Sequence, residues 1–363
     1  MCWWTYLLLG VYYRISLPLR WWFFRKAVRS GRVPAIILFY HRVADDCATP
    51  WTISNRMFRR QVQGLCRRVE LVSLNELQRQ LSERNNRRLL CAITFDDGYA
   101  ENCQQAIPLL LERRIPFTYF VTVGNILSGK PFEHDLKCGL SPRPNSLEEI
   151  RWMAAAGAQI GPHGWNHVDL GSLRCSKALH REVVASKEAL ASLVGQPIDY
   201  FAFPYGYPRN IPPEAIRLAK SAGYRGICSA YGGYNFPGDD PFHLKRYHGD
   251  HSFLLYRHRL RPDWLKLCRS NRSSVEETKE LAGLVGECAR TNALISIPAT
   301  EALASRPATE AFAATTVLDK EFSDPETAEA AAATPQKGNI NAACDSLVLE
   351  ETAPSLAGFA SRG

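Results

Sequence analysis

Short apolar runs alternate with longer amphipathic stretches between residues 33 and 264. The runs are rich in β-branched and aromatic residues, and most are continuously apolar, as is typical of parallel strands buried on both faces. Predicted strands begin near Ala35, Cys91, Phe117, Ala158, Tyr200 and Arg225. Stretches with helical periodicity cover 55–68, 73–83, 100–113, 146–156, 175–194 and 211–222. This alternation predicts a parallel sheet or a closed α/β barrel.

The first thirty residues follow a different pattern. They hold four of the eight tryptophans and five basic residues but no acidic residue. Their order of basic and apolar parts differs from that of a secretory signal, and Arg14, Pro18 and Arg20 interrupt the roughly 20 apolar residues that a membrane span needs. Tryptophan together with arginine favours the membrane–water interface, so residues 1–32 are expected to bind a membrane surface. The alternative is a hydrophobic arm packed on the domain that follows.

The chain changes character again after about residue 268. We expect a short helical extension over 269–296 and a disordered tail over 297–363, which is rich in Ala, Thr, Ser and Glu and lacks Trp and Tyr. The expected catalytic domain therefore covers 33–268.

Charge is distributed unevenly between these parts. The net charge is +8, but residues 301–363 carry four basic and ten acidic residues, so the rest of the chain carries +8 − (4 − 10) = +14. A basic body suits nucleic acid, an anionic membrane or an acidic substrate. No nucleic-acid-binding motif is present, so an anionic membrane surface and a glycan are the expected partners, with a membrane-associated, cell-envelope or extracellular location. The 11 cysteines include no C-x-x-C pair, which argues against a zinc ribbon.

Three motifs follow predicted strands and carry candidate chemistry. The first is Thr94–Gly98, TFDDG, in which two adjacent carboxylates repel each other unless a cation lies beside them. In the second, Gly161–His167, two histidines four residues apart would share one face of a helical turn. Strand ends meet at one end of a barrel, where one carboxylate and two imidazoles would form a three-ligand metal site. The third, Phe201–Gly206, reads FAFPYG and predicts a rigid loop.

The three motifs, in this order, resemble those of the polysaccharide deacetylase (NodB-homology) family. The likeness extends to PAIILFYHRV at 34–43 and to DPFHLKR at 240–246, and so covers about residues 33–265. The FAFPYG form is similar to that of poly-β-1,6-N-acetylglucosamine deacetylases. The resemblance implies a distorted, incomplete (β/α) barrel with one divalent metal ion, Zn²⁺ first and Ni²⁺ or Co²⁺ as alternatives.

The resemblance also implies a role for each site residue. Asp97, His163 and His167 would bind the metal, Asp96 would be the general base, and Tyr205 would offer its backbone N–H to the oxyanion. Two departures from the family pattern concern the remaining roles. The third motif has Ala202 and Phe203 where many members have an arginine that orients the base, so Arg246 is the candidate for that role. The Leu-x-His motif that supplies the general acid has no clear copy, which leaves His248 as a candidate.

The implied function is removal of N-acetyl groups from a glycan of the cell envelope or of an exopolysaccharide. A small-molecule amidohydrolase on the same barrel is one alternative, and a non-catalytic carbohydrate-binding protein is another.

Overall fold

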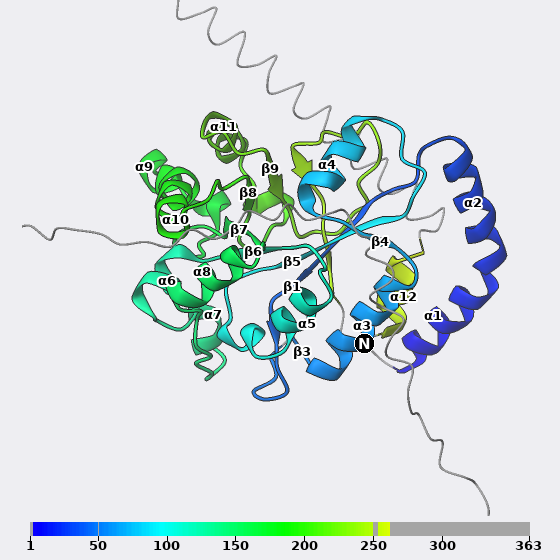
Figure 1. Ribbon diagram of the computed structural model, residues 1–363, viewed down its shortest axis with the longest axis horizontal. Helices are drawn as coiled ribbons and strands as arrows, with labels where there is room; N and C mark the ends of the chain where they lie inside the picture. Colours follow the sequence, from blue (N-terminus) through cyan, green and yellow to red (C-terminus); the bar gives the residue numbers. More distant parts are fainter. Residues whose placement is uncertain (1–2, 50, 250–252, 262–363) are drawn as a thin grey trace, which may run out of the picture. The chain divides into compact units, whose positions relative to one another are not determined.

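The computed structural model describes residues 3–49, 51–249 and 253–261 (Figure 1). The expected extension over 269–296 and the expected tail over 297–363 lie outside the described residues. The six strands and the helical stretches predicted between residues 33 and 264 are all present, and the structure adds short strands and helices that the sequence pattern did not predict.

The elements are as follows. The helices are α1 (Trp3–Ile15), α2 (Leu17–Arg29), α3 (Asn55–Cys66), α4 (Leu74–Ser82), α5 (Ala106–Glu112), α6 (Val123–Ser128), α7 (Glu133–Leu136), α8 (Leu147–Ala155), α9 (Ser176–His180), α10 (Ser186–Val194), α11 (Pro213–Ser221) and α12 (Phe253–Arg259), with the short helical segments η1 (Ala100–Cys103), η2 (Leu170–Ser172), η3 (Arg181–Ala185) and η4 (Pro208–Asn210). The strands are β1 (Ile36–Tyr40), β2 (Arg42–Val43), β3 (Thr52–Ile53), β4 (Glu70–Leu71), β5 (Leu90–Phe95), β6 (Phe117–Val121), β7 (Gln159–Pro162), β8 (Tyr200–Ala202), β9 (Gly226–Cys228), β10 (His243–Leu244) and β11 (Tyr247–His248).

The strands form an incomplete ring. One sheet has the order β11-β1-β5-β6-β7, with β4 also paired to β5, and a second has the order β10-β9-β8. Every ladder in both is parallel. The segment 243–248 links the two sheets, because its first part pairs with β9 and its last part pairs with β1. Among the described residues no ladder joins β7 to β8. The distorted, incomplete α/β barrel is therefore confirmed.

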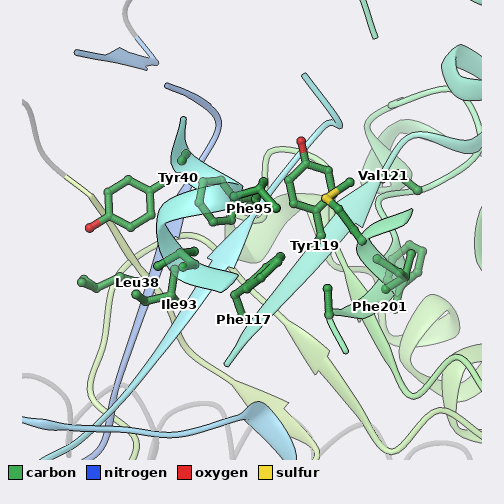
Figure 2. Packing of buried hydrophobic residues seen from close by; sticks show 14 of the residues in the cluster. Leu38, Tyr40, Ile93, Phe95, Phe117, Tyr119, Val121 and Phe201 are labelled. Atoms are coloured by element: carbon green, nitrogen blue, oxygen red, sulfur yellow. The ribbon is translucent and has the colours of Figure 1, made fainter. Parts of the chain in front are cut away.

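Alternation along the strands separates two layers of apolar side chains. Leu38, Ile93, Phe95 and Tyr119 belong to the larger buried cluster, together with residues of α3, α5 and α8. Figure 2 shows these side chains in rows on neighbouring strands. Ile37, Ala92 and Phe120, which alternate with them on the same strands, belong to a separate inner cluster. Strands that bury both faces in this way need helices on the outside, which the intervening segments supply.

Helix α4 closes the amino end of the barrel. Its Leu74, Leu77 and Leu81 are buried in the inner cluster. Gln78, also buried, donates hydrogen bonds to the carbonyl of Arg225, directly before β9, and to that of Pro241, before β10. The carboxyl ends of the strands, which carry the three motifs, lie opposite this plug.

The first two helices form an arm that precedes β1 (Figure 1). Backbone hydrogen bonds from Ser16 to Tyr12 and from Arg20 to Ser16 continue the helical ladder across the junction. The arm enters the sheet at its amino end, where Val33 donates to the carbonyl of Asn86. Within the described part of the chain, no helix combines the length and the apolar character needed to cross a bilayer.

Candidate metal centre

The two adjacent carboxylates of the first motif lie at the carboxyl end of β5. Asp96 continues the strand, since its N–H donates to the carbonyl of Tyr40 at 2.8 Å. Asp97 and Gly98 then adopt left-handed φ angles of 71° and 102°. An aspartate tolerates such a conformation better than most residues do, and a glycine adopts it without strain. Both carboxylates are buried, at 2% and 1% exposure, and they have different partners.

The two histidines of the second motif lie on a loop after β7. The expected helical turn is wrong, because Gly164 and His167 have φ angles of 76° and 53° and the segment is irregular. The Glu182 carboxylate holds the loop by accepting hydrogen bonds from the N–H groups of Trp165 and Asn166, at 2.7 and 3.1 Å. A Cβ on Gly164 would lie 2.7 Å from a Glu182 oxygen, so the loop needs glycine there.

Asp97, His163 and His167 converge on one point. Oδ1 of Asp97 lies 3.6 Å from Nε2 of His163 and 3.2 Å from Nε2 of His167. The three potential ligand atoms all lie within 4.8 Å of one another. Among the described residues, no group donates a well-formed hydrogen bond to the buried Oδ1. Nδ1 of His163 lies 2.8 Å from the carbonyl oxygen of Ala202, which favours a proton on Nδ1 and leaves Nε2 free to bind a metal.

The surroundings of Asp97 and His163 favour the protonation states in which these side chains can bind a metal. Burial alone would raise the pKa of Asp97, but the charges of the neighbouring histidines, His167 first, outweigh it, so the pKa is lowered and the carboxylate is ionised. Burial lowers the pKa of His163 to about 4, so its imidazole is neutral. A buried carboxylate oxygen that receives no hydrogen bond, together with two imidazole nitrogens that face it, is a typical ligand set for a divalent cation. The three residues therefore fit a metal ion.

Asp96 forms a two-point ion pair with Arg246. Nη1 and Nη2 of the arginine donate to Oδ1 and Oδ2 at 2.7 and 2.9 Å. Arg246 is fully buried, and it also donates to the carbonyl of Ser229 and to the hydroxyl of Thr94. Burial would raise the pKa of Asp96, but the positive charge of Arg246 outweighs it and lowers the pKa. Arg246, the candidate for orienting Asp96, therefore lies in direct contact with that carboxylate.

Tyr205, in the third motif, lies at the edge of the site. Tyr205 and Gly206 both have left-handed φ angles, 61° and 62°. The Tyr205 ring is 49% exposed, and its centroid lies 5.1 Å from that of His167. The loop therefore borders the candidate ligand His167 on the solvent side.

His248 is accompanied by a histidine that the sequence analysis missed. His248 on β11 is paired with Phe39 on β1, two residues before His41. Tyr40 on β1 is paired with Phe95 on β5, so His41 and Asp96 directly follow a pair of neighbouring strand residues. The rings of His41 and His248 are 5.4 Å apart. Nδ1 of His41 is buried and has no hydrogen-bond partner in the part of the chain that the structure describes. His41 could have been found from its place directly after a buried strand.

His134 is a further histidine beside Asp97, and it lies near the second carboxylate oxygen. Nε2 of His134 lies 3.7 Å from Oδ2 of Asp97 and 2.8 Å from the hydroxyl of Tyr99. That hydroxyl also donates to the buried Asp135 and accepts from Nε1 of Trp51. The short helix α7, which carries His134 and Asp135, has no periodicity that sequence reasoning could have used.

Comparisons with known proteins agree with the resemblance that the sequence motifs carry. Residues 83–227 match the family described as polysaccharide deacetylase. The chitooligosaccharide deacetylase of Bradyrhizobium sp. (strain ANU 289) is 31% identical over 117 residues, which cover 31% of this chain and 45% of that protein. The chitooligosaccharide deacetylase of Rhizobium leguminosarum bv. trifolii is 30% identical over 105 residues, 29% of this chain and 40% of that protein. These matches span less than half the length of the curated relatives.

Among solved structures, IcaB from Ammonifex degensii is similar to this chain with a TM-score of 0.53 and 24% identity over 63% of this chain and 98% of that one. The deacetylase PplD from Streptococcus pyogenes, solved in complex with acetate, has a TM-score of 0.54 and 20% identity over 63% of this chain and 99% of that one. At these identities the likeness concerns the fold.

Proposed function

We propose that this chain, whose residues 83–227 match the polysaccharide deacetylase family, is a metal-dependent hydrolase that removes N-acetyl groups from an N-acetylated glycan. One observation carries the proposal. A buried three-ligand set, Asp97, His163 and His167, lies beside a second carboxylate, Asp96, that is oriented by Arg246. The first group suits a divalent cation, and the second suits proton transfer.

Amide hydrolysis needs an activated water and a proton acceptor, and different residues of the site would supply each. A divalent ion held by Asp97, His163 and His167 would polarise the acetyl carbonyl and lower the pKa of a water molecule toward about 7. Asp96 accepts the proton of the attacking water. Its lowered pKa keeps it ionised near neutral pH, and each carboxylate oxygen retains a lone pair beside its bond to Arg246.

The remaining roles concern the oxyanion and the leaving amine. Tyr205, next to His167, is the proposed backbone donor to the oxyanion, a kind of contact worth roughly 100- to 1000-fold in rate. The leaving nitrogen needs a proton. The pair of His41 and His248 lies on the Asp96 side of the site, and we assign the proton donor to this pair.

The proposed substrate class is a glycan with N-acetylated amino sugars, and the proposed metal is Zn²⁺. Two similar proteins are named chitooligosaccharide deacetylases, which supports this class. The plug of α4 at the opposite end of the barrel leaves the carboxyl end as the side on which a long substrate approaches.

A substrate panel tests the proposal. The purified protein, loaded with Zn²⁺, is incubated with N-acetylated oligosaccharides and with small cyclic amides, and released acetate or ring opening is measured before and after chelation. We expect acetate from the oligosaccharides only, and its loss after chelation. Ring opening of cyclic amides without acetate release would favour an amidohydrolase. Oligosaccharide binding without any turnover would favour a carbohydrate-binding protein.

A further inference from the structure

The outward face of the α1–α2 arm (residues 3–29) is apolar over most of its length. Leu8, Val11, Ile15, Leu19 and Trp22 follow one another at intervals of three or four residues, so they share one face of the nearly continuous helix. Their exposed fractions lie between 46% and 74%. Leu7 and Trp21 widen the stripe, at 49% and 60% exposure. Seven large apolar side chains thus face away from the barrel, more than is usual for a surface in water.

The inward face of the arm combines apolar side chains, such as the buried Tyr13, with one buried arginine. Arg20 is buried, and its guanidinium contacts Nδ1 of His258 at 3.0 Å and donates to the carbonyl of Arg261. Its Nε donates to the hydroxyl of Ser16 at 2.7 Å. A helix that only covers a protein core buries its apolar face and exposes its polar one. This arm also buries Tyr13 and is attached through Arg20, yet it leaves the apolar stripe exposed to water.

Basic residues adjoin the stripe. Arg25, Lys26 and Arg29 are exposed on the last turns of α2, and Arg25 and Lys26 lie over the rings of Trp21 and Trp22. The first acidic residue of the chain is Asp45. Phe24 borders a surface groove to which the barrel contributes four arginines, Arg67, Arg68, Arg87 and Arg88, and one acid, Glu70, which pairs with Arg88. The positive charge therefore continues from the arm onto the barrel.

We propose that the α1–α2 arm lies in the surface of an anionic lipid bilayer, with the stripe of Leu8, Val11, Ile15, Leu19 and Trp22 in the acyl boundary and the basic residues at the headgroups. Apolar side chains, interfacial tryptophans and a cationic flank are the features of such a helix. The arm joins the amino end of β1, whereas the metal ligands follow the carboxyl ends of β5 and β7. This separation allows the barrel to bind a glycan while the arm is in the membrane.

Charge disfavours a second copy of the chain as the occupant of this face. Two arms packed in parallel would bring two clusters of Arg25, Lys26 and Arg29 together, and two packed antiparallel would leave each cluster without an acidic partner on the other arm. An anionic bilayer supplies both an apolar phase and the opposite charge.

Vesicle binding by the full-length chain tests the proposal. Sedimentation is measured with phosphatidylcholine vesicles that contain or lack phosphatidylglycerol. The stripe variant carries Leu8→Gln, Leu19→Gln and Trp22→Gln, and the control variant carries Leu127→Gln, Leu136→Gln and Trp152→Gln, which remove two leucines and one tryptophan of similar exposure elsewhere. We expect the stripe variant to lose roughly tenfold or more of its affinity for anionic vesicles and the control to retain it.

Two further measurements exclude the alternatives. Lipids brominated in their acyl chains should quench the tryptophan fluorescence of the wild type, and the stripe variant should lose this quenching. A charge variant combines Arg25→Gln, Lys26→Gln and Arg29→Gln. It should bind anionic vesicles roughly tenfold or more weakly than the wild type and bind pure phosphatidylcholine equally well. Equal binding by stripe variant and control, or binding that high salt abolishes without any quenching, would overturn the proposal. So would a wild-type dimer that ignores vesicles and dissociates in the stripe variant.

Discussion

At the scale of single residues, the site depends on separating two adjacent carboxylates. Asp96 stays in register with β1 and meets Arg246, whereas the left-handed turn at Asp97 directs the next carboxylate to His163 and His167. Like charges so close together would otherwise raise each other's pKa. Separate cationic or metal-binding partners let both remain ionised, which the proposed division between base and ligand requires.

The first prediction concerns the metal ligands. The wild type should bind close to one divalent ion, because the described ligand set is a single cluster of three residues. His163→Ala and His167→Ala should each weaken binding by more than the roughly 10- to 100-fold that is typical for loss of an outer-shell partner. Isothermal titration with Zn²⁺ measures this, with the exposed His180→Ala as control. Stoichiometric tight binding by the double variant would disprove the assignment.

The second prediction concerns Arg246. Replacing it with glutamine would leave a buried charge on Asp96 without a partner, at a cost of about 3–5 kcal/mol in unfolding free energy. Arg246→Lys keeps the charge but loses the two-point geometry that fixes the carboxylate. We expect kcat of Arg246→Lys to fall on the order of 100-fold, with KM and metal content little changed. A kcat near that of the wild type would show that Arg246 only stabilises the fold.

The site residues were predictable in unequal measure. Asp96, Asp97, His163 and His167 stand in short motifs at strand ends, so the sequence indicated both their chemistry and their meeting point. The two histidines were predicted to meet on a helical turn, but they meet on a loop. Gly164 and Glu182 impose a left-handed bend there, which the spacing of the histidines alone does not reveal. His134 reaches Asp97 only through tertiary folding, so no local signal marked it.

At the scale of elements, the segment 243–248 completes the site. It leaves β9 and joins β1 within a few residues, and Arg246 lies at the point of change. Asn235 supports this crossing, because its side-chain amide bonds both the N–H and the carbonyl of Lys245 while its backbone pairs with Ala35. Strands of two residues give too short a pattern to predict, so the crossing was not evident from the sequence.

The third prediction concerns the contact of β7 with β8. A Cβ on Gly161 would lie 2.6 Å from the carbonyl oxygen of Tyr200, so Gly161→Ala must push β7 away from β8. We expect a loss of about 1–3 kcal/mol in unfolding free energy, as is typical of overpacking, and weaker Zn²⁺ binding because His163 follows β7. Chemical denaturation and titration measure the two effects. Gly10→Ala, where the added atom meets no neighbour closer than 3.9 Å, should cause neither, and an unaffected Gly161→Ala would contradict the account.

At the scale of the whole molecule, the barrel and the arm follow different rules. The barrel could be predicted because each buried strand and amphipathic helix repeats the same pattern. The arm was expected either to bind a membrane or to pack on the barrel. The structure shows the packing, through Arg20, and an outward apolar face. Hydrophobicity along the sequence could not tell which face would be inside, because the inward anchor is a polar residue.

The fourth prediction concerns the region after residue 296. Its composition provides too little apolar surface to form a core, so truncation before Ile297 should change neither the melting temperature nor the turnover of short substrates. Thermal unfolding and acetate release from an oligosaccharide measure this in the truncated and full-length proteins. A large drop in melting temperature would show that the region packs on the barrel.

The most direct test of the central claim is acetate release from an N-acetylated oligosaccharide by the wild type and by Asp96→Asn, each carrying a measured equivalent of Zn²⁺. The account predicts turnover by the wild type that chelation removes. It predicts that Asp96→Asn retains metal and substrate binding but releases almost no acetate, because no group remains to accept the proton of the attacking water. Near-normal release by Asp96→Asn, or release by the wild type that persists after complete removal of metal, would contradict it.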